Sequence, residues 1–118
     1  MSGPVLVVDD DPAIRDAVRD VLEAAGMRVA TAQDGADALE QVLAEAPRLV
    51  LLDMRMPVMD GWRFAQALRE RDLALPVVVM TAAADARRWA EEIGAQGFVA
   101  KPFAVSDLVS TVERFVAG

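Results

Sequence analysis

Residues 49–61 have the sequence LVLLDMRMPVMDG, in which an unbroken apolar run ends abruptly at Asp53 and a turn-rich segment follows. The four residues before Asp53 are too uniformly apolar for a strand with one face in water. They predict a strand that helices cover on both sides. In open sheets of this kind, ligands and chemistry gather at the carboxyl ends of the strands. Asp53 therefore stands where a functional group is expected, although an Asp that ends a strand is also a common turn residue.

The pattern of an apolar run followed by a helical segment recurs along the chain. Strands are predicted at residues 5–8, 28–32, 49–52, 76–80 (ending at Thr81) and 97–100. Helices are predicted from Pro12 to Gly26, from about 38 to Pro47, over 62–71, from about Asp85 to Ile93, and over an apolar face at 108–116. Five strands alternating with five helices predict an α/β domain with a parallel sheet wrapped on both faces. We expect the flavodoxin-like, doubly wound strand order 2-1-3-4-5 in one domain, residues 1–118.

Composition narrows the class of protein. The chain has 118 residues, 54% of them hydrophobic and 26% charged, which is typical of one globular domain. No apolar run approaches the ~20 residues that span a bilayer, and the N-terminus lacks a secretory pattern, so we expect a cytoplasmic protein without a membrane partner. The net charge of −7 argues against direct binding to nucleic acid. The last helix takes the chain to its end, so we expect no output domain.

Two absences limit the chemistry. The chain has no Cys, which excludes disulfides, thiolate nucleophiles and zinc–sulfur sites. It also has no His, which excludes Ser-His-Asp catalysis and imidazole metal ligands. The chemistry must therefore use carboxylates, hydroxyls, Arg and Lys, with a hard cation if there is a metal. Lys101 is the only Lys among twelve basic residues.

Polar side chains follow four of the five predicted strands. Asp9 and Asp10 follow the first strand, Asp53 the third, Thr81 the fourth and Lys101 the fifth. In the expected strand order the first and third strands are neighbours, so three carboxylates crowd into one shallow pocket. Such crowding is unfavourable unless a cation relieves it. The all-oxygen ligand set favours Mg²⁺, and a divalent ion together with Lys101 would balance the three aspartates. Taken singly, each of these residues also has an ordinary structural explanation as a cap, a strand end or a solvated charge.

Four motifs carry a resemblance to a known family. They are VVDD at 7–10, LLDMRMPVMDG at 51–61, MTA at 80–82 and FVAKPF at 98–103. The chain resembles the receiver domain of two-component response regulators, of the stand-alone kind found in chemotaxis, over essentially its whole length. The resemblance implies that Asp53 is the phosphoacceptor and that Asp9, Asp10, Asp53 and the backbone carbonyl of Arg55 hold Mg²⁺. It further implies that Thr81 is a switch hydroxyl, Phe98 the switch aromatic, and Lys101 the site lysine before a cis Pro102.

What the resemblance implies about function is a phosphorylation-activated signalling switch. A sensor histidine kinase or a histidine phosphotransfer protein would donate the phosphoryl group from a phosphohistidine. The switch would then change the face made by the fourth helix, fifth strand and fifth helix, and so signal to an unknown protein target. Asp53 phosphorylation and dephosphorylation would be self-catalysed, so the domain is not expected to be an enzyme in the ordinary sense. We expect a monomer or a weak homodimer.

Other functions fit less well. A haloacid-dehalogenase-type phosphatase needs a second Asp two residues after its nucleophile, where this chain has Arg55. A flavin binder needs a Gly- and hydroxyl-rich loop after the first strand, where this chain has three Asp. A receiver used as a phosphorylation-independent docking or dimerisation module stays open. A long Arg55 and a small Ala83 predict slow autodephosphorylation, and Trp89 is either packed against the sheet or an exposed anchor for a partner.

Overall fold

Five parallel strands form one sheet in the order β2-β1-β3-β4-β5, which confirms the predicted topology. The computed structural model describes residues 3–116, so both ends of the predicted domain lie outside the described residues. The strands are β1 (Val5–Val8), β2 (Val29–Ala32), β3 (Leu49–Leu52), β4 (Val77–Ala82) and β5 (Gly97–Lys101). The helices are α1 (Pro12–Ala24), α2 (Gly35–Ala44), α3 (Gly61–Glu70), α4 (Ala83–Ile93) and α5 (Val105–Val116).

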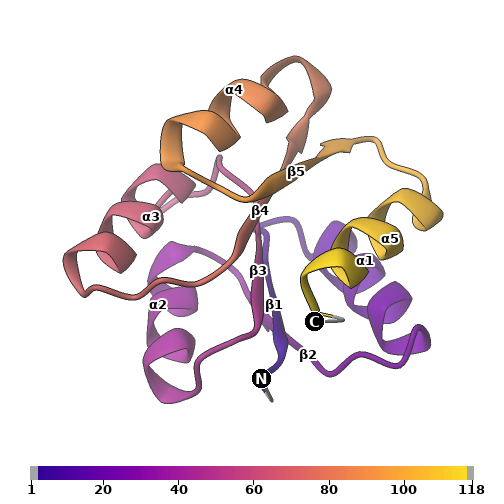
Figure 1. Ribbon diagram of the computed structural model, residues 1–118, viewed down its shortest axis with the longest axis horizontal. Coiled ribbons are helices and arrows are strands. Elements are labelled where there is room, and N and C mark those ends of the chain that lie inside the picture. The colour runs from indigo at the N-terminus through magenta and orange to yellow at the C-terminus, as the bar shows by residue number, and fades with distance from the viewer. Residues whose placement is uncertain (1–2, 117–118) are drawn as a thin grey trace.

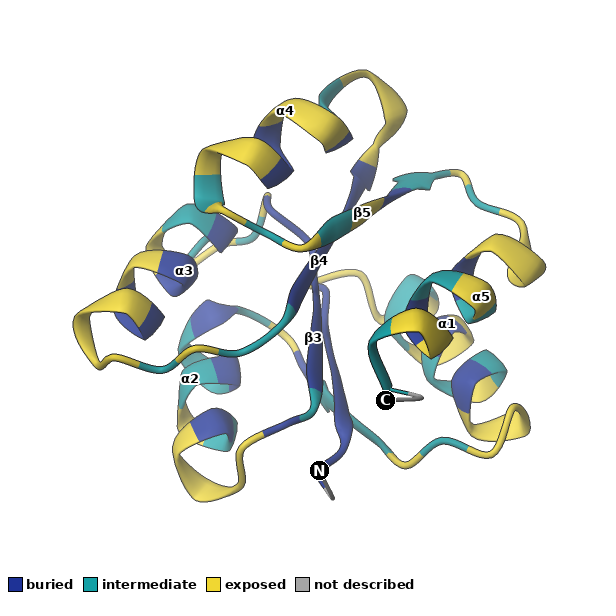
Figure 2. Ribbon diagram, in the orientation of Figure 1, coloured by how far each residue is buried: buried dark blue, intermediate teal, exposed yellow. Residues whose placement is uncertain are grey.

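The helices cover the sheet on both sides, as the apolar strands require. Figure 1 shows α1 and α5 on one face and α2, α3 and α4 on the other. Alternate side chains of β1 supply the two layers: Leu6 and Val8 pack with the second group of helices, and Val5 and Val7 with the first. Every residue of β1 and β3 is buried, which explains why neither strand alternates between apolar and polar residues (Figure 2).

Aspartates fix where three of the helices begin. The side chain of Asp11 accepts hydrogen bonds from the first turn of α1, Asp34 from Asp37 in α2, and Asp60 from Arg63 in α3. Each carboxylate satisfies a backbone N–H that has no partner inside the helix. Helix α4 begins differently, because Ala82 stands at its N-cap and no side chain caps it. Of these four helices, α4 is therefore the most weakly anchored at its N-terminus.

The structure corrects several predicted boundaries. Helix α2 begins at Gly35 rather than at about 38, α3 spans Gly61–Glu70 rather than 62–71, β4 begins at Val77 rather than 76, and β5 ends at Lys101 rather than 100. Strand β2 begins at Val29 rather than 28, and β4 continues one residue past Thr81 to Ala82. Helix α4 begins at Ala83, two residues earlier than predicted. Alanine has the highest helix propensity, so Ala83 and Ala84 join the helix even without a capping side chain. Among residues 3–116, no helix has both the length and the apolar character needed to cross a membrane.

Candidate functional site: an acidic pocket at the carboxyl edge of the sheet

The register of the sheet brings the predicted site residues to one edge. Val8 of β1 pairs with Leu52 of β3, so Asp9 and Asp53 leave neighbouring strands at the same level. The backbone N–H of Asp53 donates to the carbonyl of Val8 at 2.9 Å, which continues the ladder by one step. On the other side of β3, the end of β4 pairs with the end of β5, where Ala82 lies opposite Lys101.

Three carboxylates converge at this edge. Oxygens of Asp9, Asp10 and Asp53 all lie within 4.8 Å of one another. Asp9 is completely buried and Asp53 is 7% exposed, whereas Asp10 faces solvent. The Nζ of Lys101 lies 2.8 Å from Oδ2 of Asp9 and 3.9 Å from Oδ2 of Asp53. One ammonium cannot neutralise three carboxylates, so the pocket retains an excess of negative charge.

The pocket also changes the acidity of Asp53. Burial raises the pKa of Asp53 from 3.8 to about 6; Lys101 opposes the increase, and the charges of Asp9 and Asp10 add to it. The backbone N–H of Arg55 donates to Oδ1 of Asp53 at 3.4 Å and also favours the ionised form. With a pKa of about 6, Asp53 is mostly a carboxylate at pH 7, so it can act as a nucleophile without a general base.

Asp9 is held by contacts that the sequence analysis did not identify. Its Oδ1 accepts a hydrogen bond from the backbone N–H of Asp11 at 2.9 Å, and its carbonyl accepts one from Nη1 of Arg15 at 3.0 Å. Arg15 lies one turn into α1, and helical side chains point back toward the N-terminus, which brings its guanidinium to the pocket. The sequence offered one signal for this contact, which is an Arg about one helical turn after the Asp cluster at 9–11.

The loop after Asp53 is built from close backbone contacts. The N–H of Met59 donates to the carbonyl of Pro57 at 2.8 Å, which places Val58 at the centre of a three-residue turn with a φ of 69°. Gly61 then lies against Met54: its N–H donates to the Met54 carbonyl at 2.9 Å, and a Cβ at Gly61 would meet the sulfur at 2.5 Å. This close approach explains why Gly stands at position 61.

Thr81 and Phe98 lie on the two strands beyond Asp53, and Pro102 directly follows β5. Thr81 is buried at the end of β4, at 6% exposure. Phe98 on β5 is 38% exposed, and the guanidinium of Arg87 lies 5.6 Å from the centre of its ring, on the outside of the molecule. The Lys101–Pro102 peptide bond is cis, as expected.

Arg55 and Trp89 are in contact, although they come from different elements. The Arg55 guanidinium lies 5.2 Å from the centre of the Trp89 ring. Trp89 is buried at 6% exposure and packs in the core with Ile93 nearby, which confirms the packed alternative and excludes the exposed anchor. Trp62 meets Trp89 edge-on at 4.9 Å between ring centres, and its Nε1 donates to Glu92 at 2.9 Å.

The donor set fits a small, hard divalent cation. All three candidate side-chain ligands are carboxylates on neighbouring strand ends, and Asp10 leaves the cluster open to solvent on one side. Mg²⁺ prefers such oxygen ligands and keeps several of its waters, so an open cluster of this kind suits it. Three carboxylates beside one ammonium leave an excess of negative charge, which makes a cation favourable here.

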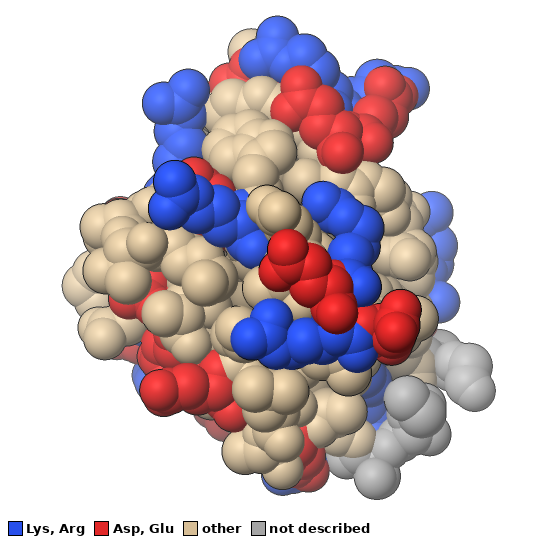
Figure 3. Space-filling model, turned by 90° about the vertical axis from the view of Figure 1, so that its left-hand side faces the viewer, with Lys and Arg blue, Asp and Glu red and all other residues tan. Residues whose placement is uncertain are grey.

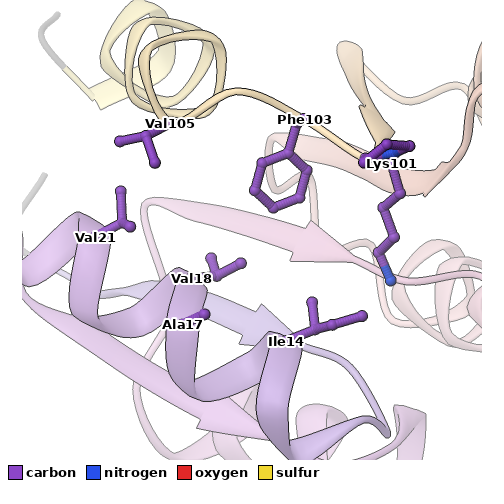
Figure 4. Close-up of a pocket in the computed structure, with 8 residues that line it drawn as sticks. Ile14, Ala17, Val18, Val21, Lys101, Phe103 and Val105 are labelled. Carbon is purple, nitrogen blue, oxygen red and sulfur yellow. The ribbon is translucent and has the colours of Figure 1, made fainter.

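An apolar groove of about 450 Å³ lies beside the pocket. It is lined by Ile14, Ala17, Val18 and Val21 of α1 and by Lys101, Pro102, Phe103 and Val105 after β5. Figure 4 shows the Phe103 ring directed toward α1, while the Lys101 side chain extends away along the edge of the groove. The groove and the acidic pocket therefore share Lys101.

Comparison with known proteins places this architecture in a family. The model for the response regulator receiver domain matches residues 5–113. The chain is 38% identical over 117 residues to the DNA-binding transcriptional regulator NtrC of Escherichia coli (strain K12), and 40% identical over 117 residues to the transcriptional regulatory protein PrrA of Mycobacterium tuberculosis. These alignments cover 98% of this chain, which spans 25% of NtrC and 50% of PrrA.

Solved structures of response regulators have the same fold as this chain. The receiver domain of NtrX from Brucella abortus superposes with a TM-score of 0.87 at 33% identity, over 96% of this chain and 98% of that one. The chemotaxis response regulator CheY4 of Vibrio cholerae gives a TM-score of 0.87 at 32% identity, over 98% and 100%. With the strand order and the acidic pocket, these matches show that the chain belongs to the response regulator receiver domain family.

Proposed function

We propose that this receiver domain accepts a phosphoryl group on Asp53, in the presence of Mg²⁺, and uses it to switch a protein-binding face. The observation that carries the proposal is a buried, mostly ionised carboxylate beside two others and one Lys, at the carboxyl edge of a parallel sheet. Catalytic groups gather at this edge in doubly wound folds. A cytoplasmic location belongs to the same proposal.

The chemistry follows from the residues present. An oxygen of Asp53 attacks phosphorus and forms an acyl phosphate, while the P–N bond of the donor phosphohistidine breaks and its electron pair leaves with the imidazole. Lys101, 3.9 Å from Asp53, pairs with the phosphoryl oxygens as charge develops on them. Asp9 and Asp10, with Asp53 and the Arg55 carbonyl, would hold Mg²⁺, which neutralises further phosphoryl charge when bound.

The switch uses the two strands beyond Asp53. Thr81 donates its hydroxyl hydrogen to the new phosphoryl oxygens, and Phe98 turns inward into the space that Thr81 leaves. Phe98 is available for this change because its side chain is 38% exposed, with the Arg87 guanidinium over its ring. The result is a shift in the population of the α4–β5–α5 face rather than a new fold.

The fate of the phosphoryl group depends on its access to water. In hydrolysis, a water oxygen bonds to phosphorus and Asp53 leaves as a carboxylate. Arg55 is long and stands beside the pocket, whereas Ala83 is small and offers no group that could orient a water. We therefore infer slow autodephosphorylation with Mg²⁺, and a phosphoryl lifetime of seconds would contradict it.

Intact mass tests the chemical step. Incubation with acetyl phosphate and Mg²⁺ should add one phosphoryl group to the wild type and none to Asp53→Asn. Asp60→Asn is the matched control, because Asn can still cap α3 and Asp60 lies outside the acidic pocket. Retention of the adduct in Asp53→Asn, or its loss in Asp60→Asn, would contradict the assignment of Asp53.

The partner is tested separately. The groove beside Lys101 supports docking of a phosphohistidine protein there, because an apolar surface next to the nucleophile can seat the donor. Val105→Glu should slow transfer from a phosphohistidine protein but leave labelling by acetyl phosphate intact. Leu43→Glu is the control: Leu43 is about as exposed as Val105, at 61% against 58%, but lies on α2. Equal effects of the two changes would exclude the groove as the docking site.

A further inference from the structure

The contact between Arg55 and Trp89 joins the phosphorylation loop to α4 by a route that does not involve Thr81. The backbone N–H of Arg55 donates to Asp53 at 3.4 Å, while its guanidinium lies 5.2 Å from the centre of the Trp89 ring. One residue thus contacts the nucleophile through its main chain and the switch helix through its side chain. Figure 3 shows that acidic and basic side chains are interspersed on the face made by α2, α3 and α4.

We propose that Arg55 is a mobile charge that reports phosphorylation directly to α4, an inference that rests on the proposed function. In the unphosphorylated protein its guanidinium stacks on Trp89. In the phosphorylated protein it moves to the phosphoryl oxygens on Asp53 and leaves the indole uncovered.

The relative strength of the two contacts sets the direction of this exchange. Arg55 is exposed, and a cation over an aromatic ring at an exposed site is a weak interaction. A guanidinium paired with phosphoryl oxygens makes charge-assisted, bidentate hydrogen bonds, which are among the strongest in proteins. The main chain of Arg55 already contacts the Asp53 carboxylate, so its long side chain can reach the phosphoryl group by rotating about its own bonds.

Trp89 is held in a fixed position, so the departure of the Arg55 guanidinium changes how well its ring is covered. It lies in the core cluster, and Trp62 fixes it edge-on at 4.9 Å while Trp62 is itself tied to Glu92 at 2.9 Å. A second guanidinium, that of Arg88, lies 5.9 Å from the Trp89 ring centre. Arg88 is on α4 itself and pairs with Asp85 at 2.6 Å, so it moves with the helix and does not sense the pocket. Arg88 therefore serves as an internal control.

The test measures the accessibility of Trp89 to a neutral quencher. A Trp62→Phe background leaves Trp89 as the only tryptophan of the chain. Acrylamide quenching is measured before and after acetyl phosphate and Mg²⁺, and intact mass of the same sample counts the phosphoryl adduct. Phosphorylation should raise the quenching constant to the value that Arg55→Met shows without phosphorylation. In Arg55→Met no further increase should follow, whereas Arg88→Met should retain the increase.

The outcomes separate the two proposals. An adduct without any change in quenching, or an increase that persists in Arg55→Met, would overturn the exchange of Arg55 and leave the phosphorylation of Asp53 standing. No adduct in the wild type would overturn the proposed function, and this inference with it. Arg55→Lys keeps the charge but not the planar guanidinium, so it should also lose most of the increase in the quenching constant on phosphorylation. The same loss in this conservative variant would show that the result for Arg55→Met does not come from a folding defect.

Discussion

The ionised form of Asp53 is destabilised by its position at the edge of the sheet. Burial and two neighbouring carboxylates disfavour its charge more than Lys101 favours it, so its pKa rises to about 6. An acid whose pKa is higher in the folded state binds its proton more tightly there than in the unfolded chain. Folding is therefore weakened as the pH rises from about 4 through 6, and the cost is constant above that range.

Asp53→Asn should remove this cost. In a chelating buffer without Mg²⁺, we expect the stability advantage of Asp53→Asn over the wild type to grow by about 2–3 kcal/mol between pH 4 and pH 7, and then to level off. Urea unfolding of both proteins across this range measures the difference. A difference that is independent of pH, or that shrinks as pH rises, would show that the carboxylate is not strained by its surroundings.

Position 61 requires Gly because of its close contact with Met54, not because of its backbone conformation. A Cβ there would lie 2.5 Å from the sulfur and 2.8 Å from the Cα of Met54, and the Cα cannot move aside. Gly61→Ala should therefore cost about 1–3 kcal/mol in the free energy of unfolding. Gly97→Ala is the comparison, because its Cβ would meet the Phe115 ring at an ordinary 3.5 Å. If both changes cost the same, the close approach of the loop is not what requires glycine at 61.

Among the helices, α4 combines a central place in the proposed switch with an uncapped N-terminus. Ala82 has an extended backbone suited to an N-cap but no side chain that can accept a hydrogen bond. Ala82→Ser should stabilise the protein by about 0.5–1 kcal/mol, whereas Asp34→Ala, which removes the cap of α2, should destabilise it by about 1 kcal/mol. Thermal unfolding checks both signs. No gain from Ala82→Ser would mean that the start of α4 is fixed by packing alone.

Secondary elements were predictable where local chemistry decides them. The apolar runs of β1 and β3 and the Pro that begins α1 are local signals, and both kinds led to the correct fold. The gathering of Asp9 and Asp53 followed from strand order alone. The start of α4 was wrong by two residues, because the alanine run has helix propensity but no stop or start signal.

Side-chain contacts between elements were not predictable in the same way. The stacking of Arg55 on Trp89 joins residues 34 positions apart, and the Trp62–Trp89 contact joins α3 to α4. Neither has a periodicity or a spacing that a sequence reveals. The first depends on how the loop after β3 meets α4, and the second on how α3 and α4 pack on the sheet. The position of Arg15 beside Asp9 likewise became clear only from the structure.

For the molecule as a whole, the excess charge of the acidic pocket links folding to cation binding. A ligand that binds only the folded state stabilises it in proportion to the logarithm of its concentration. Above its dissociation constant, Mg²⁺ should raise the free energy of unfolding by about 1.4 kcal/mol for each tenfold increase in concentration. Asp10→Asn should flatten this dependence. Asp11→Asn should preserve it, because Asp11 caps α1 outside the carboxylate cluster and Asn can cap as well. A dependence on Mg²⁺ that survives Asp10→Asn but not Asp11→Asn would contradict the assigned site.

Phosphorylation of Asp53 is proposed to change the α4–β5–α5 face. The alternative is a docking module that has the acidic pocket but does not respond to phosphorylation. Amide hydrogen exchange tests the proposed change most directly, on wild type and Asp53→Asn, each with acetyl phosphate and Mg²⁺, with the adduct counted by intact mass. We predict altered exchange in peptides covering Thr81 to Val116 of the phosphorylated wild type, and unchanged exchange there in Asp53→Asn. A complete adduct with no change in those peptides would contradict the switch and favour a phosphorylation-independent module.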